Sequence, residues 1–380
     1  MRLSEFAQRE PIDDITAHTL NALWASRFDG ELRFGTEGPG QRWRAHDLLS
    51  AYFDPGLGAA GRTYLRDGFR NTPRRSRRAA QWLLGTALAS VPGLRLSSRE
   101  AFYVEGDRPT KDLLVVPGNR RLRLLDFGQG RAVVATKRGY DSASLSTELR
   151  VRSERQAKFM VPVLEADAEA GWLEEPLLQG WPLPRAPRDH DQRASLLWAR
   201  DAVAQWAEPE CRSEDTADYL GPLLERLKVD LQTAHERFPD LHRVPPAWQQ
   251  QLESWALEAP RVEVLPSHGD LQAGNLWLQA DRSSVLILDW ERSAPRSRGY
   301  DGRVQELATR SPVGLGARII GGVREAGSDR SALSLFLLED WQWFLTEALD
   351  VPGARCPGGL ATLHAELSAC ASELVSGGLT

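Results

Sequence analysis

The sequence predicts an α+β fold in which a small antiparallel, β-rich lobe is followed by a larger helical lobe. From about Ala101, short apolar runs such as AFYV, DLLVVPGN and LRLLDFGQGRAVVATK alternate with turn residues, which is typical of strands joined by hairpins. From Arg188 to about Ser254, and again from about Ser331, apolar residues recur at helical spacing. Strands and helices are therefore expected in separate parts of the chain.

These changes of pattern divide the 380 residues into three segments. Residues 1–95, which contain Gly- and Pro-rich breaks, are predicted to form a mostly helical N-terminal extension. Residues 96–180 are predicted to form the small β-rich lobe, and residues 181–380 the helical lobe.

Composition restricts the classes of function. With 42% hydrophobic and 26% charged residues, the chain suits a soluble globular protein, and its net charge of −5 gives no reason to expect nucleic acid. The cysteines Cys211, Cys356 and Cys370 are scattered, so neither a disulfide framework nor a zinc site is expected. The start MRLSEFAQREPIDD does not have the pattern of a signal peptide, and we expect a cytoplasmic protein.

The segment LPSHGDLQAGNLWL contains the residues best suited to chemistry. Asp270 and Asn275 stand in one short loop with two glycines, and the apolar run VLIL further on ends in Asp289. Two carboxylates and a carboxamide are the hard oxygen ligands that suit Mg²⁺ beside phosphate groups. A carboxylate that orients a hydroxyl, together with bound metal, is what phosphoryl transfer requires.

HGDLQAGN and LDWE resemble the catalytic motifs of the aminoglycoside phosphotransferase and choline kinase superfamily, which shares the bilobal protein-kinase fold. The pattern there is HGDxxxxN, followed by a strand that ends in (I/L)D(W/F)E. The resemblance implies that Asp270 is the catalytic base and that Asn275 and Asp289 bind Mg²⁺. It also implies that His268 supports the loop, while Gln272 stands where a histidine is often found.

The function that the resemblance implies is transfer of the γ-phosphoryl group of ATP to a hydroxyl of a small molecule, of the aminoglycoside, amino alcohol or sugar class. Three alternatives stay open: a kinase for a sugar of a cell-envelope glycan or lipid, a protein kinase, and a nucleotide-binding regulator without turnover. The identity of the acceptor, the choice between ATP and GTP, and the oligomeric state do not follow from the sequence.

The resemblance extends upstream to the residues that would bind the nucleotide. Lys137 ends the run AVVATK, and in kinases a lysine at this place contacts the phosphates and pairs with a glutamate of the next helix. We expect Glu148 to be that partner, with Glu154 as the second choice.

Two further nucleotide contacts are expected from the same resemblance. Gly128 and Gly130 are interpreted as the turn that covers the nucleotide, although the preceding Asp126 makes the turn spell DFG. The metal-binding aspartate must follow the catalytic loop, so this DFG is set aside. The segment LEEPLLQG resembles the family's hinge, where the Leu178 backbone is expected to meet the adenine.

Two charged segments have no role in this scheme. Arginines recur at every fourth position from Arg62 to Arg78, next to an apolar stretch, which would suit peripheral contact with an anionic surface or simple packing on the small lobe. The segment LEDWQWFLTEALD, at residues 338–350, carries four carboxylates that either line an acceptor pocket or pack within a helix.

Overall fold

The protein forms two compact units in the computed structural model. The structure describes residues 3–28, 31–68, 75–311, 313–326, 330–351 and 356–376. The first unit comprises Met1–His190 and Leu276–Glu291, and the second comprises Asp191–Asn275 and Arg292–Thr380. The chain therefore returns to the first unit directly after the loop that contains Asp270 and Asn275.

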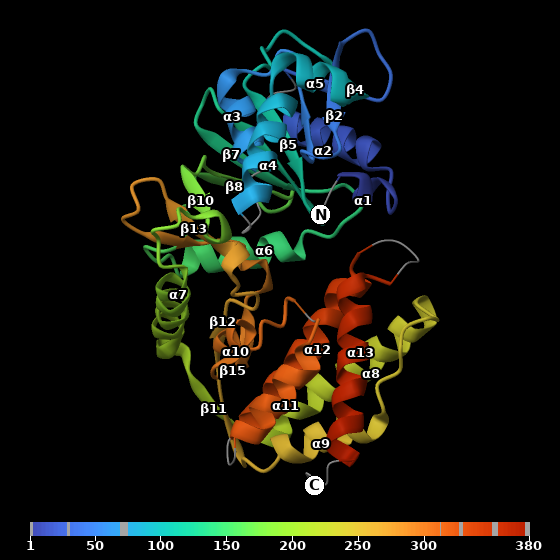
Figure 1. The fold of residues 1–380 in the computed structure, drawn as a ribbon, viewed down its shortest axis with the longest axis vertical. Coiled ribbons are helices and arrows are strands. Elements are labelled where there is room, and N and C mark those ends of the chain that lie inside the picture. The colour runs from blue at the N-terminus through green and yellow to red at the C-terminus, as the bar shows by residue number, and fades with distance from the viewer. Residues whose placement is uncertain are drawn as a thin grey trace. The chain divides into compact units, whose positions relative to one another are not determined.

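The first unit is built on an antiparallel sheet of nine strands in the order β1-β4-β2-β3-β5-β6-β7-β9-β8. These strands are β1(Arg33–Gly35), β2(Gln41–His46), β3(Ala51–Phe53), β4(Arg99–Glu105), β5(Leu113–Pro117), β6(Arg121–Asp126), β7(Arg131–Thr136), β8(Glu165–Asp167) and β9(Trp172–Pro176). Figure 1 labels β2, β4, β5, β7 and β8 of this sheet. The hairpin predicted around FGQG is confirmed, because Asp126 pairs with Arg131 across the turn. The antiparallel, β-rich lobe of the predicted α+β fold is thus present.

Residues 1–95, predicted as an extension of their own, are part of this first unit. They contribute the strands β1, β2 and β3 to the sheet, together with the helices α1(Leu3–Ala7), α2(Ile12–Arg27), α3(Ala59–Gly68) and α4(Arg75–Leu88), and α5(Val91–Ser97) follows. Two of the strands have only three residues, too few for an alternating pattern to be recognised in the sequence.

The two faces of the sheet pack against different helices. On one face, Leu124 and Val133 belong to a core with Trp24 of α2. On the other face, Leu125 and Ala132 pack with Leu65 of α3. Farther along that second face, Val134 packs with Leu145 of α6(Ala143–Glu154). Side chains alternate along a strand, so odd-numbered residues of β6 and even-numbered residues of β7 face α3 and α6. The other residues of these two strands face α2.

A second, three-stranded sheet completes the first unit. Its strands are β10(Gly180–Pro182), β13(Leu276–Gln279) and β14(Val285–Ile287), all antiparallel. Leu276 pairs with Ile287, so the chain leaves β14 close to where it entered β13 and reaches Asp289 two residues later.

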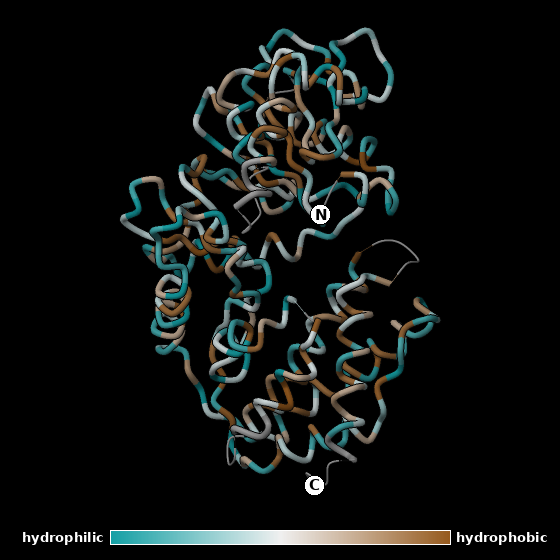
Figure 2. The backbone as a smooth tube through the Cα atoms, in the orientation of Figure 1, coloured by the Kyte–Doolittle hydropathy of each residue, from teal (hydrophilic) through white to brown (hydrophobic). Residues whose placement is uncertain are grey.

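The second unit is mainly helical, as predicted. Its helices are α7(Gln192–Ala207), α8(Thr216–Arg237), α9(Pro246–Ala256), α10(Tyr300–Glu306), α11(Leu315–Ala326), α12(Arg330–Leu349) and α13(Gly358–Ser376). Three strands, β11(Arg212–Asp215), β12(Arg261–Ser267) and β15(Ala294–Ser297), form a small antiparallel sheet. Helix α12 is buried along most of its length, as expected for a central helix. In the second unit, hydrophobic segments of the chain alternate with polar ones (Figure 2).

The core of the second unit contains a buried histidine, His364 of α13. Its Nε2 accepts a hydrogen bond from the Trp341 indole N–H at 3.1 Å, and its Nδ1 lies 2.8 Å from the His242 carbonyl oxygen. The imidazole is therefore held in its neutral form, donating through Nδ1. Burial lowers the pKa of His364 from 6.5 to about 4.

We expect this histidine to make the second unit less stable in acid. Below pH 6.5 the unfolded chain binds a proton that the folded chain does not, so the free energy of unfolding falls by roughly 2 kcal/mol between pH 7.5 and pH 5. Urea unfolding of the wild type and of His364→Gln at the two pH values measures the difference. His242→Gln, which removes an exposed imidazole, is the control, and equal pH dependence in all three proteins would contradict the assignment.

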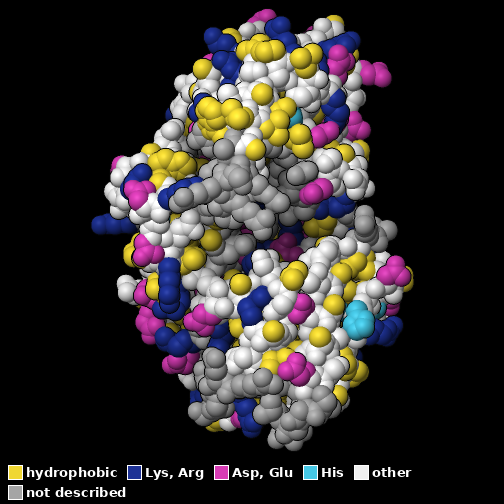
Figure 3. All heavy atoms as spheres, viewed as in Figure 1, with side chains coloured by type: hydrophobic (Ala, Val, Ile, Leu, Met, Phe, Trp, Pro, Cys, Tyr) yellow, Lys and Arg dark blue, Asp and Glu magenta, His cyan; other side chains and the backbone are white. Residues whose placement is uncertain are grey.

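The arginine-rich segment is divided between two helices. Arg62 and Arg66 belong to α3, which ends at Gly68, and α4 begins only at Arg75. The arginines at positions 70 and 74, and the side chains of 75–78, lie outside the described residues. Trp82, Leu83 and Leu84 of α4 are exposed. Exposed hydrophobic side chains are also visible on the face of the molecule drawn in Figure 3. Contact with an anionic surface stays a prediction.

Among the described residues, no helix combines the length and the apolar composition that crossing a bilayer requires.

Candidate active site

The loop after β12 is fixed by a buried carboxylate. Asp301 of α10 accepts hydrogen bonds from the backbone N–H of His268 at 2.7 Å and of Gly269 at 3.0 Å. Gly269 has a φ of +87°, and a Cβ at this position would collide with the Arg292 carbonyl group. The glycine of the HGD motif is thus required by the backbone itself.

Asp270 and Asn275, which the motif predicts to act together, are in direct contact. The Asn275 side chain donates to the backbone oxygen and to the Oδ2 of Asp270, both at 2.9 Å. Gln272 donates to both carboxylate oxygens of Asp270, at 3.2 and 3.0 Å. The Asn275 amide nitrogen is used within the loop, so its carboxamide oxygen is the atom suited to a cation.

Arg310 is a residue of this site that sequence reasoning missed. Its Nε donates to Asp270 Oδ1 at 2.6 Å, and its Nη1 donates to Asp340 Oδ1 at 2.8 Å. Its Nη2 donates to the Gly269 carbonyl oxygen at 3.0 Å, and the guanidinium lies 3.6 Å from the Trp343 ring centroid. Arg310 therefore ties the aspartate of the loop to α12 and fixes the direction of its carboxylate.

The ion pairs of Arg310 lead to a prediction about stability. In Arg310→Met, the carboxylates of Asp270 and Asp340 lose their buried cation, so we expect the free energy of unfolding to fall by about 3–5 kcal/mol. Urea unfolding measures it. Arg330→Met removes an exposed pair with Glu258 and is expected to cost about 1 kcal/mol or less. Equal losses in the two variants would show that Arg310 does not hold the loop.

The carboxylates of α12 that were candidates for an acceptor pocket already have partners. Glu339 is buried and accepts hydrogen bonds from the Ser297 backbone N–H at 2.7 Å and from its hydroxyl at 2.6 Å. Asp340 accepts from the Tyr300 hydroxyl at 2.8 Å as well as from Arg310. Burial raises the pKa of Glu339, although its hydrogen bonds oppose that shift. These contacts support the packing interpretation of this segment.

In the first unit, Asp289 follows β14 and lies near a cluster of charged groups. Its φ is +66°, a left-handed conformation that is uncommon for a residue other than glycine. Two residues later, Glu291 forms an ion pair with Arg121 Nη2 at 2.9 Å. Asp289 is also among the carboxylates that stabilise the charge of Arg121: burial alone would lower the pKa of that guanidinium, but Glu148, Glu291 and Asp289 raise it.

Glu148 is a buried residue of α6. This helix packs on the face of the sheet from which the Arg121 side chain projects. Glu148 pairs with Arg121 and, at 2.7 Å, with Arg152, which also reaches Glu175 at 2.9 Å. Burial alone would raise the pKa of Glu148, but the charges of Arg121 and Arg152 outweigh it and hold the pKa at about 2. The glutamate predicted from the resemblance is thus paired, but with arginines.

The predicted pairing of Lys137 with Glu148 is wrong. Lys137 is completely buried, and its ammonium donates to Glu10 at 2.6 Å and lies 4.5 Å from the Phe6 ring centroid. Burial lowers the pKa of Lys137, although Glu10 opposes that shift. Lys137 follows Val133 of β7 by four residues, an even number, so its side chain faces α2 as that of Val133 does. Lys137 therefore lies on the face of the sheet opposite to the one that Glu148 contacts.

The predicted hinge borders a pocket of about 440 Å³ within the first unit. Leu178 lines it, as do Phe127 of the β6–β7 turn and Tyr64 of α3. The Gly130 carbonyl oxygen accepts a hydrogen bond from the Leu177 backbone N–H at 2.9 Å, so this turn is tied to the hinge. Gly128 and Gly130 therefore lie at the hinge end of β6, whereas Arg121 is at its other end.

The side chains that would hold magnesium fit the ion by their chemistry. Asn275 offers a carboxamide oxygen and Asp289 a carboxylate, and Mg²⁺ commonly takes one or two such protein ligands together with phosphate oxygens and water. Within the described part of the chain, no cluster of three or more His, Cys, Asp or Glu residues suits a metal ion. Mg²⁺ held mainly by substrate and water does not need such a cluster.

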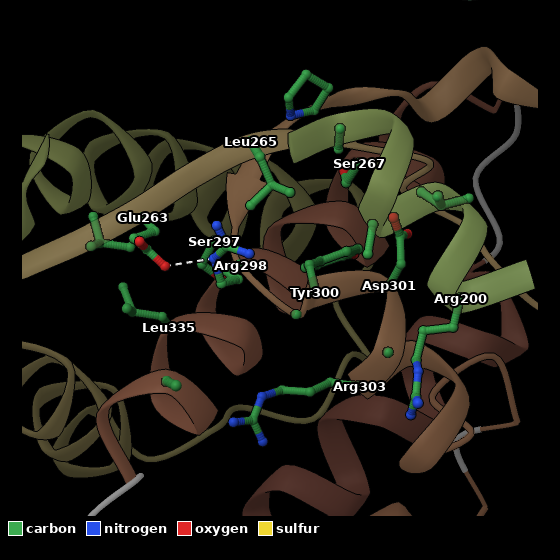
Figure 4. A pocket seen from close by; sticks show the side chains of 18 of the residues that line it. Arg200, Glu263, Leu265, Ser267, Ser297, Arg298, Tyr300, Asp301, Arg303 and Leu335 are labelled. Carbon is green, nitrogen blue, oxygen red and sulfur yellow. Dashed lines mark ion pairs between the residues drawn. The ribbon is translucent and has the colours of Figure 1, made fainter. Parts of the chain in front are cut away.

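A larger cavity, of about 710 Å³, lies within the second unit (Figure 4). It is bordered by β12, α7 and α10, and Ser267, Tyr300 and Asp301 form part of its wall. Asp301 thus separates this cavity from the loop whose backbone it binds. Asp270 is not one of the residues that line it.

No protein-family model and no curated protein matches the sequence. The fold is similar to that of solved structures at low identity. A choline/ethanolamine kinase family protein from Mesorhizobium loti is 14% identical, covers 69% of this chain and 87% of its own, and has a TM-score of 0.42. A thermostable mutant of aminoglycoside phosphotransferase APH(4)-Ia, in a ternary complex with ADP and hygromycin B, is 14% identical, covers 71% and 95%, and has a TM-score of 0.48.

A third similar structure is aminoglycoside phosphotransferase APH(3'')-Id from Streptomyces rimosus, which is 20% identical, covers 60% of this chain and 92% of its own, and has a TM-score of 0.39.

Proposed function

We propose that this protein is a magnesium-dependent kinase that transfers the γ-phosphoryl group of ATP to a hydroxyl group of a small molecule. The observation that carries the proposal is the loop in which Asp270 is held by Asn275, Gln272 and Arg310. A carboxylate fixed by three side chains has the defined direction that a base acting on a hydroxyl requires.

The residues of the site divide the tasks of this reaction between them. Asp270 accepts or orients the proton of the acceptor hydroxyl, and Arg310 and Asn275 keep its carboxylate in place. Asn275 and Asp289 supply oxygen ligands to magnesium, which when bound neutralises charge on the phosphates. The Leu178 backbone, at the edge of the 440 Å³ pocket, is the proposed contact for the base of the nucleotide.

The test is an ADP-release assay with a panel of acceptors: amino alcohols, neutral sugars and aminoglycosides, each with MgATP. Acceptor-dependent ADP release, together with a phosphorylated acceptor seen by mass spectrometry, is the expected result. Asp270→Asn is the blank, since it removes the base.

Two other results would redirect the proposal. Radiolabel transferred from ATP to the protein itself, with no acceptor turned over, would favour a protein kinase. A wild-type protein that shows no binding of MgATP in calorimetry would overturn the proposal altogether.

A further inference from the structure

The cation that the resemblance predicts to bind the phosphates of a nucleotide is sequestered in the first unit. Lys137 is completely buried and paired with Glu10, on the face of the sheet that α2 covers. Bringing its ammonium to a ligand would require breaking a buried ion pair, which is costly.

We propose that Arg121 of β6 binds the phosphates of the nucleotide, in the place that the resemblance gives to Lys137, and that Arg123 assists it. The proposal rests on the kinase function proposed above and names the cation of that same site. Both arginines stand an even number of residues before Leu125 in β6, so their side chains point to the same face of the sheet as Leu125. This is the face that α3 and α6 cover.

Arg121 contacts Glu148, the glutamate that the resemblance assigns to the phosphate-binding cation. The Arg121 guanidinium pairs with this buried glutamate of α6 and also donates to Ser144 of the same helix at 3.3 Å. A glutamate from the helix after β7 therefore positions a cation, as the resemblance implies, but the cation comes from the neighbouring strand. In the sheet Arg121 pairs with Thr136, next to Lys137 in the chain, so the two cations differ chiefly in the face they occupy.

Arg121 also pairs with Glu291, which stands two residues after the predicted metal ligand Asp289. Its Nη2 forms an ion pair with Glu291 at 2.9 Å, and Asp289 contributes to the stabilisation of its charge. A guanidinium paired with Glu291, two residues after Asp289, is suited to phosphates that a magnesium ion at Asp289 would share, because its planar fork matches phosphate oxygens.

Arg121 has a hydrogen-bond donor without a partner among the described residues, whereas all three side-chain nitrogens of Arg152 are bonded. Arg152 donates to Glu148, Glu175 and the Val161 carbonyl oxygen. The Nε of Arg121 is buried and has no hydrogen-bond partner among the described residues. Because Arg121 shares Glu148 with Arg152, it can turn toward a phosphate without leaving that carboxylate unpaired, and 11% of its side chain is exposed, whereas the Lys137 side chain has no exposed surface.

Arg123 extends the same cationic surface. Its Nη2 lies 3.6 Å from Glu175 Oε1, and 41% of its side chain is exposed. It stands two residues from Arg121, roughly 7 Å along the strand, on the same face. The two guanidinium groups can thus bind adjacent phosphate groups of the same nucleotide.

Calorimetric titration with adenosine, MgADP and MgATP tests this assignment. We expect Arg121→Gln to weaken MgATP binding by roughly tenfold to a hundredfold, while adenosine binds as it does to the wild type. Arg123→Gln is expected to have a smaller effect in the same direction, and Arg121→Lys to recover part of the loss. The matched control is Arg131→Gln, which removes a guanidinium paired with Glu174 from the turn end of β7.

The outcomes separate this inference from the proposed function. If Arg121→Gln keeps the circular dichroism spectrum of the wild type and binds MgATP equally well, Arg121 is not the phosphate-binding residue, and the kinase function stands. Equal weakening for adenosine and MgATP would show a structural role and also overturn the inference. A wild type that binds none of the three ligands overturns the proposed function, and this inference with it.

Discussion

Asp270→Asn is expected to lower kcat by roughly a hundredfold to ten-thousandfold, because a carboxamide cannot accept the proton of the acceptor hydroxyl. The change keeps the shape of the side chain, and Asn275 and Arg310 stay in place around it. Arg310 also keeps its ion pair with Asp340 and its hydrogen bond to Gly269, so the loop retains its anchor. The affinity for MgATP is expected to change little.

The measurement is the rate of acceptor-dependent ADP release at saturating MgATP, with nucleotide affinity measured separately by calorimetry. Asp281→Asn is the matched control: it alters an exposed aspartate that bonds only to Ser283 among the contacts described, and it should leave both quantities unchanged. Undiminished turnover in Asp270→Asn would show that this aspartate is not the base.

Lys137→Met is expected to lower the free energy of unfolding by about 3 kcal/mol, because the buried Glu10 carboxylate loses its close ion pair and keeps only the longer one with Arg9, at 3.6 Å, among the described residues. The Tyr140 hydroxyl, which donates to Glu10 at 2.6 Å, replaces only part of that interaction. A double variant, Glu10→Gln with Lys137→Met, removes both charges and is expected to recover most of the loss.

Urea unfolding of the wild type, the single variant and the double variant measures this coupling. The double variant should also bind MgATP with wild-type affinity, because the pair lies on the face of the sheet that α2 covers. Loss of MgATP binding in a stable double variant would return the phosphate-binding role to Lys137. Equal stability of the single and double variants would show that the ion pair is not the cause.

The parts predicted well from the sequence are those whose chemistry is local. Asp270 and Asn275 stand in one loop, so their contact follows from a short stretch of chain, and Gly269 is required by its backbone angle alone. The FGQG hairpin likewise depends on residues that are neighbours in sequence. The helical second unit follows from apolar periodicity over long segments.

The parts that could not be predicted depend on residues distant in the chain. Arg310 stands far from any motif, and it reaches Asp270 only because a turn after α10 returns to the loop. The strands β1, β2 and β3 join the main sheet through pairings with β4 and β5, which no local pattern indicates.

Lys137 and Glu148 show both what the sequence could predict and what it could not. The sequence by itself determined that a strand carrying a cation precedes a helix carrying a glutamate, and that a loop of the form HGDLQAGN follows. Only the tertiary structure decided which cation meets that glutamate. Side chains alternate between the two faces of a sheet, so the position of Lys137 directly after β7 places it on the face where Glu10 lies. The pairing of β6 with β7 brings Arg121 to Glu148 on the other face.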